Sequence, residues 1–181
     1  TNCAPAAIAS RAVAASMHLE FLPDPVSALG GAVVVNYPRD MHRNETAEPE
    51  RVLDLSLFDM RTGKEPLQAY IQMAPIQAGM TFDALAQTFL EKMNGKKITE
   101  QPFAWRPAKG GPGRMETDAL RSETISKDLK RDVYVKWAMI RVDAAHVVLI
   151  NFTMSPANEV EKARFEEATE GMVRSVAVRG Q

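Results

Sequence analysis

Apolar and polar residues alternate along two neighbouring segments in the first half of the chain. In residues 53–58 three leucines take every second position, and in residues 67–73 four apolar residues do the same. A period of two puts one set of side chains on each face of a strand. Arg61-Thr62-Gly63-Lys64 between them has the residue types of a turn, so the pattern predicts an antiparallel hairpin. Its polar positions are Asp54, Ser56, Gln68, Tyr70 and Gln72.

A second hairpin is predicted at residues 133–154. Its first strand alternates, whereas residues 147–154 are apolar at almost every position. A strand that is apolar on both sides needs cover on both sides. These residues therefore predict central strands of a sheet that lies between layers of helix.

Apolar residues recur at helical spacing in two segments. Thr81 is a suitable N-cap for the first, and Asn94-Gly95 is a typical helix end. The last helix is expected to open at Ser155-Pro156 and to run to about Val173, with its glutamates facing water. At the other end of the chain, residues 1–20 are rich in alanine and predict an N-terminal helix or a mobile tail.

The remaining segments complete a single domain over residues 21–181. Residues 32–37 predict a first strand and residues 39–50 an exposed loop, while residues 97–105 and 115–120 predict strands on either side of a Gly/Pro-rich loop. Together the elements predict an α+β fold. Its expected form is an antiparallel β-sheet flanked by helices on both faces, which is an α/β/α sandwich.

Composition and charge narrow the classes of partner. The chain has 181 residues, 45% of them hydrophobic, which is ordinary for a globular protein. Lys+Arg 22 nearly balance Asp+Glu 23, so no general attraction for nucleic acid or for an anionic membrane is expected. No apolar run approaches the roughly 20 residues that a transmembrane helix needs.

The residues that usually carry metal or nucleophilic chemistry are scattered. His18, His42 and His146 lie far apart in the sequence, and Cys3 is the single cysteine. Neither a metal site nor a disulfide is expected from this spacing, and no cofactor motif is present. The chain also lacks the G-x-S-x-G elbow of the α/β-hydrolases. The sequence therefore predicts that the protein is not an enzyme.

Three features of the chain occur in a known superfamily. A strand ends in Tyr37-Pro38, residues 79–86 open a helix, and the chain closes with a further helix. The closing helix carries Phe165, Met172, Ser175 and Val176. Over roughly residues 32–178 the chain thus resembles the PsbP/Mog-like superfamily, and in particular its bacterial DcrB-type members. The resemblance implies an α/β/α sandwich and a binding role, because known members are a photosystem accessory subunit, a nuclear-transport GTPase cofactor, secretion chaperones and envelope lipoproteins.

Three places are candidate binding sites. The polar side of the first hairpin, with Tyr70 as an anchor, is either a docking face for a protein or small ligand or a partly exposed sheet edge. Trp105 is either a second anchor or a core residue. Lys109 and Arg114 enclose a Gly/Pro-rich loop that is either a flexible connection or part of a mild basic patch for an anionic protein surface.

We therefore expect a non-catalytic bacterial binding or accessory protein that acts through protein–protein contacts, as an adaptor, chaperone or immunity factor. The alternative is a small-ligand carrier that uses a pocket between sheet and helix. The chain begins at Thr1 and not at a methionine, so its beginning is expected to have been processed or trimmed. The missing part is an export signal, an initiator methionine, or other residues that this sequence leaves out. The expected location is the bacterial periplasm or cell envelope, with the cytoplasm as the alternative.

Overall fold

The structure is a computed structural model, and it describes residues 19–180. The expected N-terminal helix or tail lies outside the described residues, apart from its last two positions.

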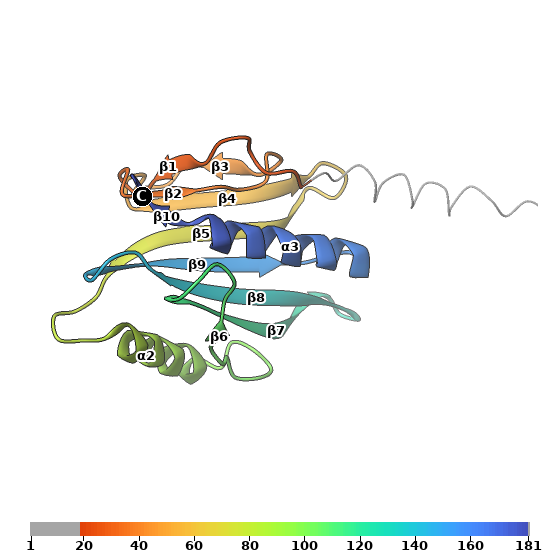
Figure 1. Cartoon of the computed structure of the whole chain (residues 1–181). Helices are drawn as coiled ribbons and strands as arrows, with labels where there is room; N and C mark the ends of the chain where they lie inside the picture. The colour runs from red at the N-terminus through yellow and green to blue at the C-terminus, as the bar shows by residue number, and fades with distance from the viewer. Residues whose placement is uncertain (1–18, 181) are drawn as a thin grey trace, which may run out of the picture.

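A seven-stranded antiparallel sheet forms the body of the molecule (Figure 1). Its order is β3-β4-β5-β9-β8-β7-β6, so β9 is the middle strand. The strands are β3 His42–Asn44, β4 Val52–Asp59, β5 Lys64–Pro75, β6 Arg106–Pro107, β7 Arg114–Ser126, β8 Leu129–Arg141 and β9 His146–Met154. Both predicted hairpins, β4–β5 and β8–β9, are present, and the second supplies the centre of the sheet as expected.

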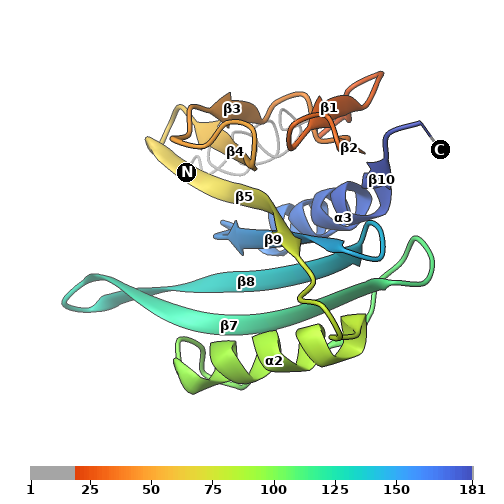
Figure 2. The same ribbon diagram turned by 90° about the vertical axis from the view of Figure 1, so that its left-hand side faces the viewer.

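A second, three-stranded sheet lies beside helix α3 (Figure 2). Its order is β1-β2-β10, with β1 Val26–Ala28, β2 Val33–Val35 and β10 Ala177–Val178. Ser175 joins this sheet to the end of α3, because its Oγ accepts the Asn36 N–H at 2.9 Å and donates to the Met172 carbonyl oxygen at 2.7 Å. The sequence predicted one strand in this region and missed the other two, which are only two and three residues long.

The two helices begin at side-chain caps. Helix α2, Phe82–Gly95, follows Thr81, whose hydroxyl accepts the Ala84 N–H as the sequence predicted. Helix α3, Glu159–Ser175, follows Asn158, whose side chain accepts the Glu161 N–H. The expected start at Ser155-Pro156 is therefore three residues too early.

Helices α2 and α3 pack against alternate side-chain positions of β8 and β9. Helix α2 shares a cluster with Met139 and Leu149, whereas α3 shares the largest core cluster with Ala138 and Ile150. The residues packed against α2 include none from β3 or β4. The α+β class and the antiparallel sheet are thus confirmed. Helical cover over both faces of the whole sheet stays a prediction.

Three other segments differ from expectation. Residues 39–50, expected as a loop, contain the short edge strand β3. Residues 97–105, expected as a strand, form none; instead the side chain of Asn94 hydrogen-bonds both the N–H and the carbonyl oxygen of Phe103, at 2.7 and 3.0 Å. The strand expected at 115–120 is the first half of β7, which continues to Ser126. Among residues 19–180, neither helix combines the length and the apolar character that crossing a bilayer requires.

Candidate functional site

The polar positions of the first hairpin lie together on one face of the large sheet. Asp54 pairs with Tyr70 and Ser56 with Gln68 across β4 and β5, and directly opposed residues point to the same face. Strand β3 adds His42 and Asn44, opposite Ser56 and Asp54. We call this surface the open face; it consists of His42, Asn44, Asp54, Ser56, Phe58, Glu65, Gln68, Tyr70 and Gln72.

Hydrogen bonds between side chains hold the open face in place. Ser56 Oγ lies 3.2 Å from His42 Nε2, 3.1 Å from Asn44 Nδ2 and 3.2 Å from Glu65 Oε1. Glu65 in turn accepts the side-chain amide of Gln68 at 2.7 Å. A network that spans three strands fixes the rotamers of these side chains, so the face presents a defined pattern of donors and acceptors.

The Ser56–His42 contact resembles part of a nucleophile–base pair, and its surroundings favour a structural role. A catalytic serine needs an accessible hydroxyl and a base held by a third group. Ser56 is 1% exposed, and its hydroxyl contacts three neighbouring side chains. Within the described part of the chain, the His42 side chain makes no hydrogen bond other than the one to Ser56. The arrangement can hold the face rigid, and it offers no open reaction centre.

Two aromatic side chains stand out from the open face. Phe58 is 45% exposed and Tyr70 is 42% exposed, and each lies next to polar groups of the network. Exposed aromatic residues on a rigid polar surface are typical anchors of protein interfaces. This combination makes the open face the leading candidate for a docking surface.

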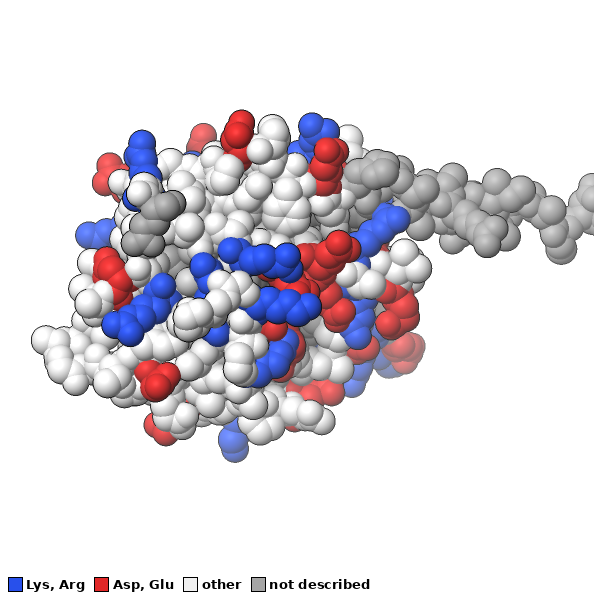
Figure 3. Space-filling model, in the orientation of Figure 1, with Lys and Arg blue, Asp and Glu red and all other residues white. Residues whose placement is uncertain are grey.

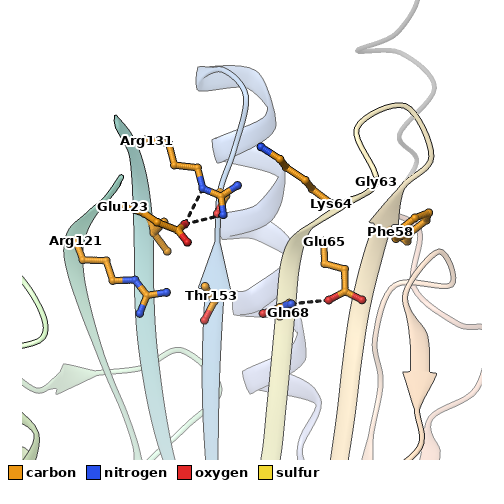
Figure 4. Close-up of a pocket in the computed structure, with 11 residues that line it drawn as sticks. Phe58, Gly63, Lys64, Glu65, Gln68, Arg121, Glu123, Arg131 and Thr153 are labelled. Atoms are coloured by element: carbon orange, nitrogen blue, oxygen red, sulfur yellow. Dashed lines mark hydrogen bonds and ion pairs between the residues drawn. The ribbon is translucent and has the colours of Figure 1, made fainter. Parts of the chain in front are cut away.

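A pocket of about 390 Å³ adjoins the open face where β9 ends (Figure 4). It lies between the β4–β5 hairpin and the outer part of the β7–β8 hairpin, and Phe58 belongs to both the pocket wall and the open face. We call it the hairpin pocket; its polar lining is Lys64, Glu65, Gln68, Arg121, Glu123, Arg131, Thr153 and Ser155. The Arg131 guanidinium hydrogen-bonds Glu123 and holds the pKa of that carboxyl below its usual value, so Glu123 stays ionised at neutral pH.

The other three predicted site residues lie elsewhere and have internal partners. Trp105 packs against Phe89 and donates its indole N–H to the Ala86 carbonyl oxygen at 2.8 Å, so it holds α2 in place. Lys109 pairs with Glu170 of α3 at 2.7 Å. Arg114 donates to backbone carbonyl oxygens at the end of α3.

The surface around α3 carries both signs of charge. Glu170 pairs with Lys109 on the Gly/Pro-rich loop and with Arg174 one helical turn away. The Lys109 ammonium lowers the pKa of the Glu170 carboxyl, chiefly through a side-chain hydrogen bond. Figure 3 shows acidic and basic side chains next to one another on this side of the molecule. The mild basic patch, one of the two alternatives for this loop, would thus be partly neutralised by α3.

Sequence reasoning missed His42, Asn44, Glu65 and the whole hairpin pocket. His42 and Asn44 are separated by one residue, which is the spacing of a strand face, but three residues are too few for a period to be recognised. The pocket depends on which strands are neighbours and where each ends. Neither property is visible in the pattern along the chain.

Solved structures with the same fold were found, whereas no family model matches the chain and no curated protein matches it in sequence. The Ran-binding protein Mog1p of Saccharomyces cerevisiae has a TM-score of 0.59 at 14% identity, over 88% of this chain and 96% of Mog1p. LpqN, involved in cell envelope biogenesis of Mycobacterium tuberculosis, has a TM-score of 0.51 at 12% identity, over 88% of this chain and 91% of LpqN.

A protein of Bacteroides thetaiotaomicron has a TM-score of 0.53 at 14% identity, over 87% of this chain. The match covers 48% of that protein, so this chain spans about half of its length. At such identities the likeness shows the fold alone. The PsbP/Mog-like fold that the sequence indicated is confirmed, and the DcrB-type assignment stays a prediction.

Proposed function

We propose that this chain, which has a PsbP/Mog-like fold, is a non-catalytic accessory protein that binds another protein through the open face. The observation that carries the proposal is the pair of exposed aromatic side chains, Phe58 and Tyr70, on a face whose polar groups are held by a hydrogen-bond network. A preorganised surface loses little entropy on binding, which favours a specific contact.

Two further points support the proposal. Mog1p, which shares the fold, is a Ran-binding protein. Ser56, the one hydroxyl in contact with a histidine on this face, is buried and engaged, which supports a binding role over a catalytic one. The proposed location is the bacterial cell envelope, and the description of LpqN as an envelope-biogenesis protein is compatible with it.

A photo-crosslinking experiment tests the open face. A benzoylphenylalanine is placed at Tyr70 in one sample and at Val160 in another, and each full chain is irradiated in a native lysate of its own organism. Val160 is 56% exposed on α3 and serves as the matched control. We expect a defined protein to crosslink from position 70 and not from position 160.

The affinity of that protein is then measured for Tyr70→Ser and Val160→Ser. Loss of an interface anchor costs about 2 kcal/mol or more, which corresponds to a Kd raised by at least about thirtyfold. Val160→Ser should change the Kd by less than about twofold. Equal crosslinking from both positions, or an unchanged Kd for Tyr70→Ser, would contradict the proposal.

A second candidate function is that of a small-ligand carrier, and the hairpin pocket favours it. Its volume of about 390 Å³ lies at the lower end of the range for small-molecule sites. The expected place for such a pocket was between sheet and helix. A polar hollow of about 300 Å³ does occur where β8 meets the start of α3, but the larger hairpin pocket lies between two hairpins.

A further inference from the structure

The hairpin pocket exists because neighbouring strands of the large sheet have unequal lengths. The last residue of β9, Met154, pairs with Tyr134 of β8, so the five residues of β8 before Tyr134 have no partner on that side. They pair only with β7 and form with it an arm that extends beyond β9. The β4–β5 hairpin forms the opposite wall, and Thr153 of β9 forms the floor.

Three basic side chains from three strands line this hollow: Lys64 of β5, Arg121 of β7 and Arg131 of β8. Arg131 is bound to Glu123, with Nε and Nη2 at 2.8 and 2.6 Å from Oε2. Within residues 19–180, the side chains of Lys64 and Arg121 make no hydrogen bond or ion pair. Figure 4 shows these two side chains on opposite walls of the pocket, with the Glu123–Arg131 pair between them.

The two carboxylates of the lining are already engaged. Glu123 is held by Arg131, and Glu65 accepts hydrogen bonds from Gln68 and Ser56 on the open face. The ammonium of Lys64 and the guanidinium of Arg121 attract Glu123 electrostatically but do not contact a carboxylate directly, and Arg121 is half-buried. A half-buried guanidinium presents donors in a planar fork that fits a carboxylate or phosphate group.

We propose that the hairpin pocket binds a small ligand bearing a carboxylate or phosphate group, with Arg121 and Lys64 at the oxyanion. The Thr153 hydroxyl and the Gln68 amide supply further polar contacts, and Phe58 and Val133 supply the apolar wall. The inference rests on the second candidate function and identifies the class of ligand. It does not depend on protein docking at Tyr70.

Nuclear magnetic resonance of the arginine Nε–Hε groups of the full chain tests the proposal. Inorganic phosphate and citrate are titrated separately, against sodium chloride at matched ionic strength. We expect a saturable shift of the Arg121 signal with at least one of the two anions and none with chloride. Saturation by phosphate alone assigns a phosphate ester as the ligand class, and saturation by citrate alone assigns a carboxylate.

Two variants of opposite expected effect accompany the titration. Lys64→Ala with Arg121→Ala removes the unpartnered cations and should weaken binding by at least about tenfold, since each removes a charge-assisted hydrogen bond. Glu65→Gln keeps the side-chain shape and removes a negative charge from the wall, so it should tighten binding at least about twofold. The control, Lys92→Ala with Arg51→Ala, removes the same charge from exposed positions outside the pocket and should leave the Kd unchanged.

Three results would overturn the proposal. One is the absence of a saturable Arg121 shift with either anion. Another is an equal loss of binding in the control double variant. The third is binding of a hexaglutamate peptide without binding of either small anion, because the pocket would then be a contact for an acidic protein. None of these results bears on crosslinking from position 70, so the two proposals fail separately.

Discussion

The side chain of Arg114 ties the start of β7 to the end of helix α3. Its Nη1 donates to the Val173 carbonyl oxygen at 2.8 Å, and its Nη2 donates to that of Val176 at 2.6 Å. Carbonyl groups in the last turn of a helix lack partners within the helix, and a half-buried cation supplies them here. Burial lowers the pKa of Arg114 from its ordinary value, but an arginine still stays charged at neutral pH.

Replacing Arg114 by methionine keeps most of the apolar stem and removes the donors. We expect Arg114→Met to lower the free energy of unfolding by about 2 kcal/mol, because buried carbonyl groups lose charge-assisted hydrogen bonds. Urea denaturation followed by circular dichroism measures the change. Arg174→Met is the matched control, since Arg174 forms only an exposed pair with Glu170 at 3.5 Å and should cost less than about 0.5 kcal/mol. Similar losses in both variants would show that Arg114 does not hold α3.

The hydrogen-bond partners of single residues were the feature hardest to predict from the sequence. Arg114 and Lys109 both lie beside the Gly/Pro-rich loop, and Arg114 does bind the Gly110 carbonyl oxygen there, but the other two carbonyl groups that it binds come 59 and 62 residues later. Ser175 belongs to the closing segment that resembles the superfamily, but its contact with the Asn36 N–H depends on the three-dimensional arrangement. A hydrogen-bond partner distant in sequence leaves no periodic signal.

At the scale of elements, Gly171 allows the segment before β1 to pack closely on α3. A Cβ atom at Gly171 would lie 2.6 Å from Cζ of Phe21, a separation that side-chain carbons do not tolerate. Phe21 also bridges to Pro38, which follows β2. The glycine in the middle of a helix thus serves the contact between α3 and the N-terminal part of the domain.

Gly171→Ala sets a gain in helix propensity against a steric clash. Alanine favours a helix by about 1 kcal/mol over glycine, whereas overpacking a core costs about 1–3 kcal/mol. We expect a net loss of stability, measured by thermal and urea unfolding, that is smaller when Phe21 is also replaced by alanine. Gly95→Ala, where no atom lies within 4 Å of the added carbon, should be neutral or stabilising. A stabilising Gly171→Ala would mean that Phe21 does not pack there.

Strands were predicted correctly where a segment is long enough to show several periods of alternation. The hairpins at 53–73 and 133–154 show several periods of alternation, and both are present. The strands that were missed, such as β1 and β10, are too short to show a period. The segment at 97–105, wrongly expected as a strand, begins with a turn and a bend, and its Phe103 backbone bonds the side chain of Asn94 and not a neighbouring strand.

At the scale of the whole molecule, stability should be highest at β9 and lowest at the projecting arm. All nine residues of β9 pair with β5, and eight of them also pair with β8. In the arm, β8 residues 129–133 pair with β7 alone. Local opening is governed by how much packing and pairing an amide would lose.

Hydrogen exchange measures this difference directly. We expect β9 amides to exchange only through global unfolding, and amides of residues 122–130 to exchange by local opening with a much smaller free energy. The central amides of β7, around Thr117, are the internal control. They belong to the same strand as the arm, but Thr117 is buried in the body of the sheet. Equal protection of β9 and the arm would contradict the assignment of the arm as a separate, weakly held unit.

The sequence supported the general architecture and part of the candidate site. Five polar residues predicted to share one side of a hairpin do lie together, because period two and antiparallel pairing determine which side chains are neighbours. The hairpin pocket was not predictable, because it arises from the position of β9 between β5 and β8 and from its early end at Met154. Strand order and relative length are properties of the assembled sheet.

The arm also exposes the outer border of β7, and this has a consequence for how the protein behaves at high concentration. Beyond Leu120, the N–H and carbonyl groups on that border could template a strand from a second molecule. Seven of the twelve residues at 121–132 are charged. Pairing the arms of two molecules along this border would desolvate those charged side chains. In addition, an irregularity in the pairing between Thr124 and Ser126 bends the arm near its tip. The residues that give the pocket its cations thereby also protect the chain against fibre formation.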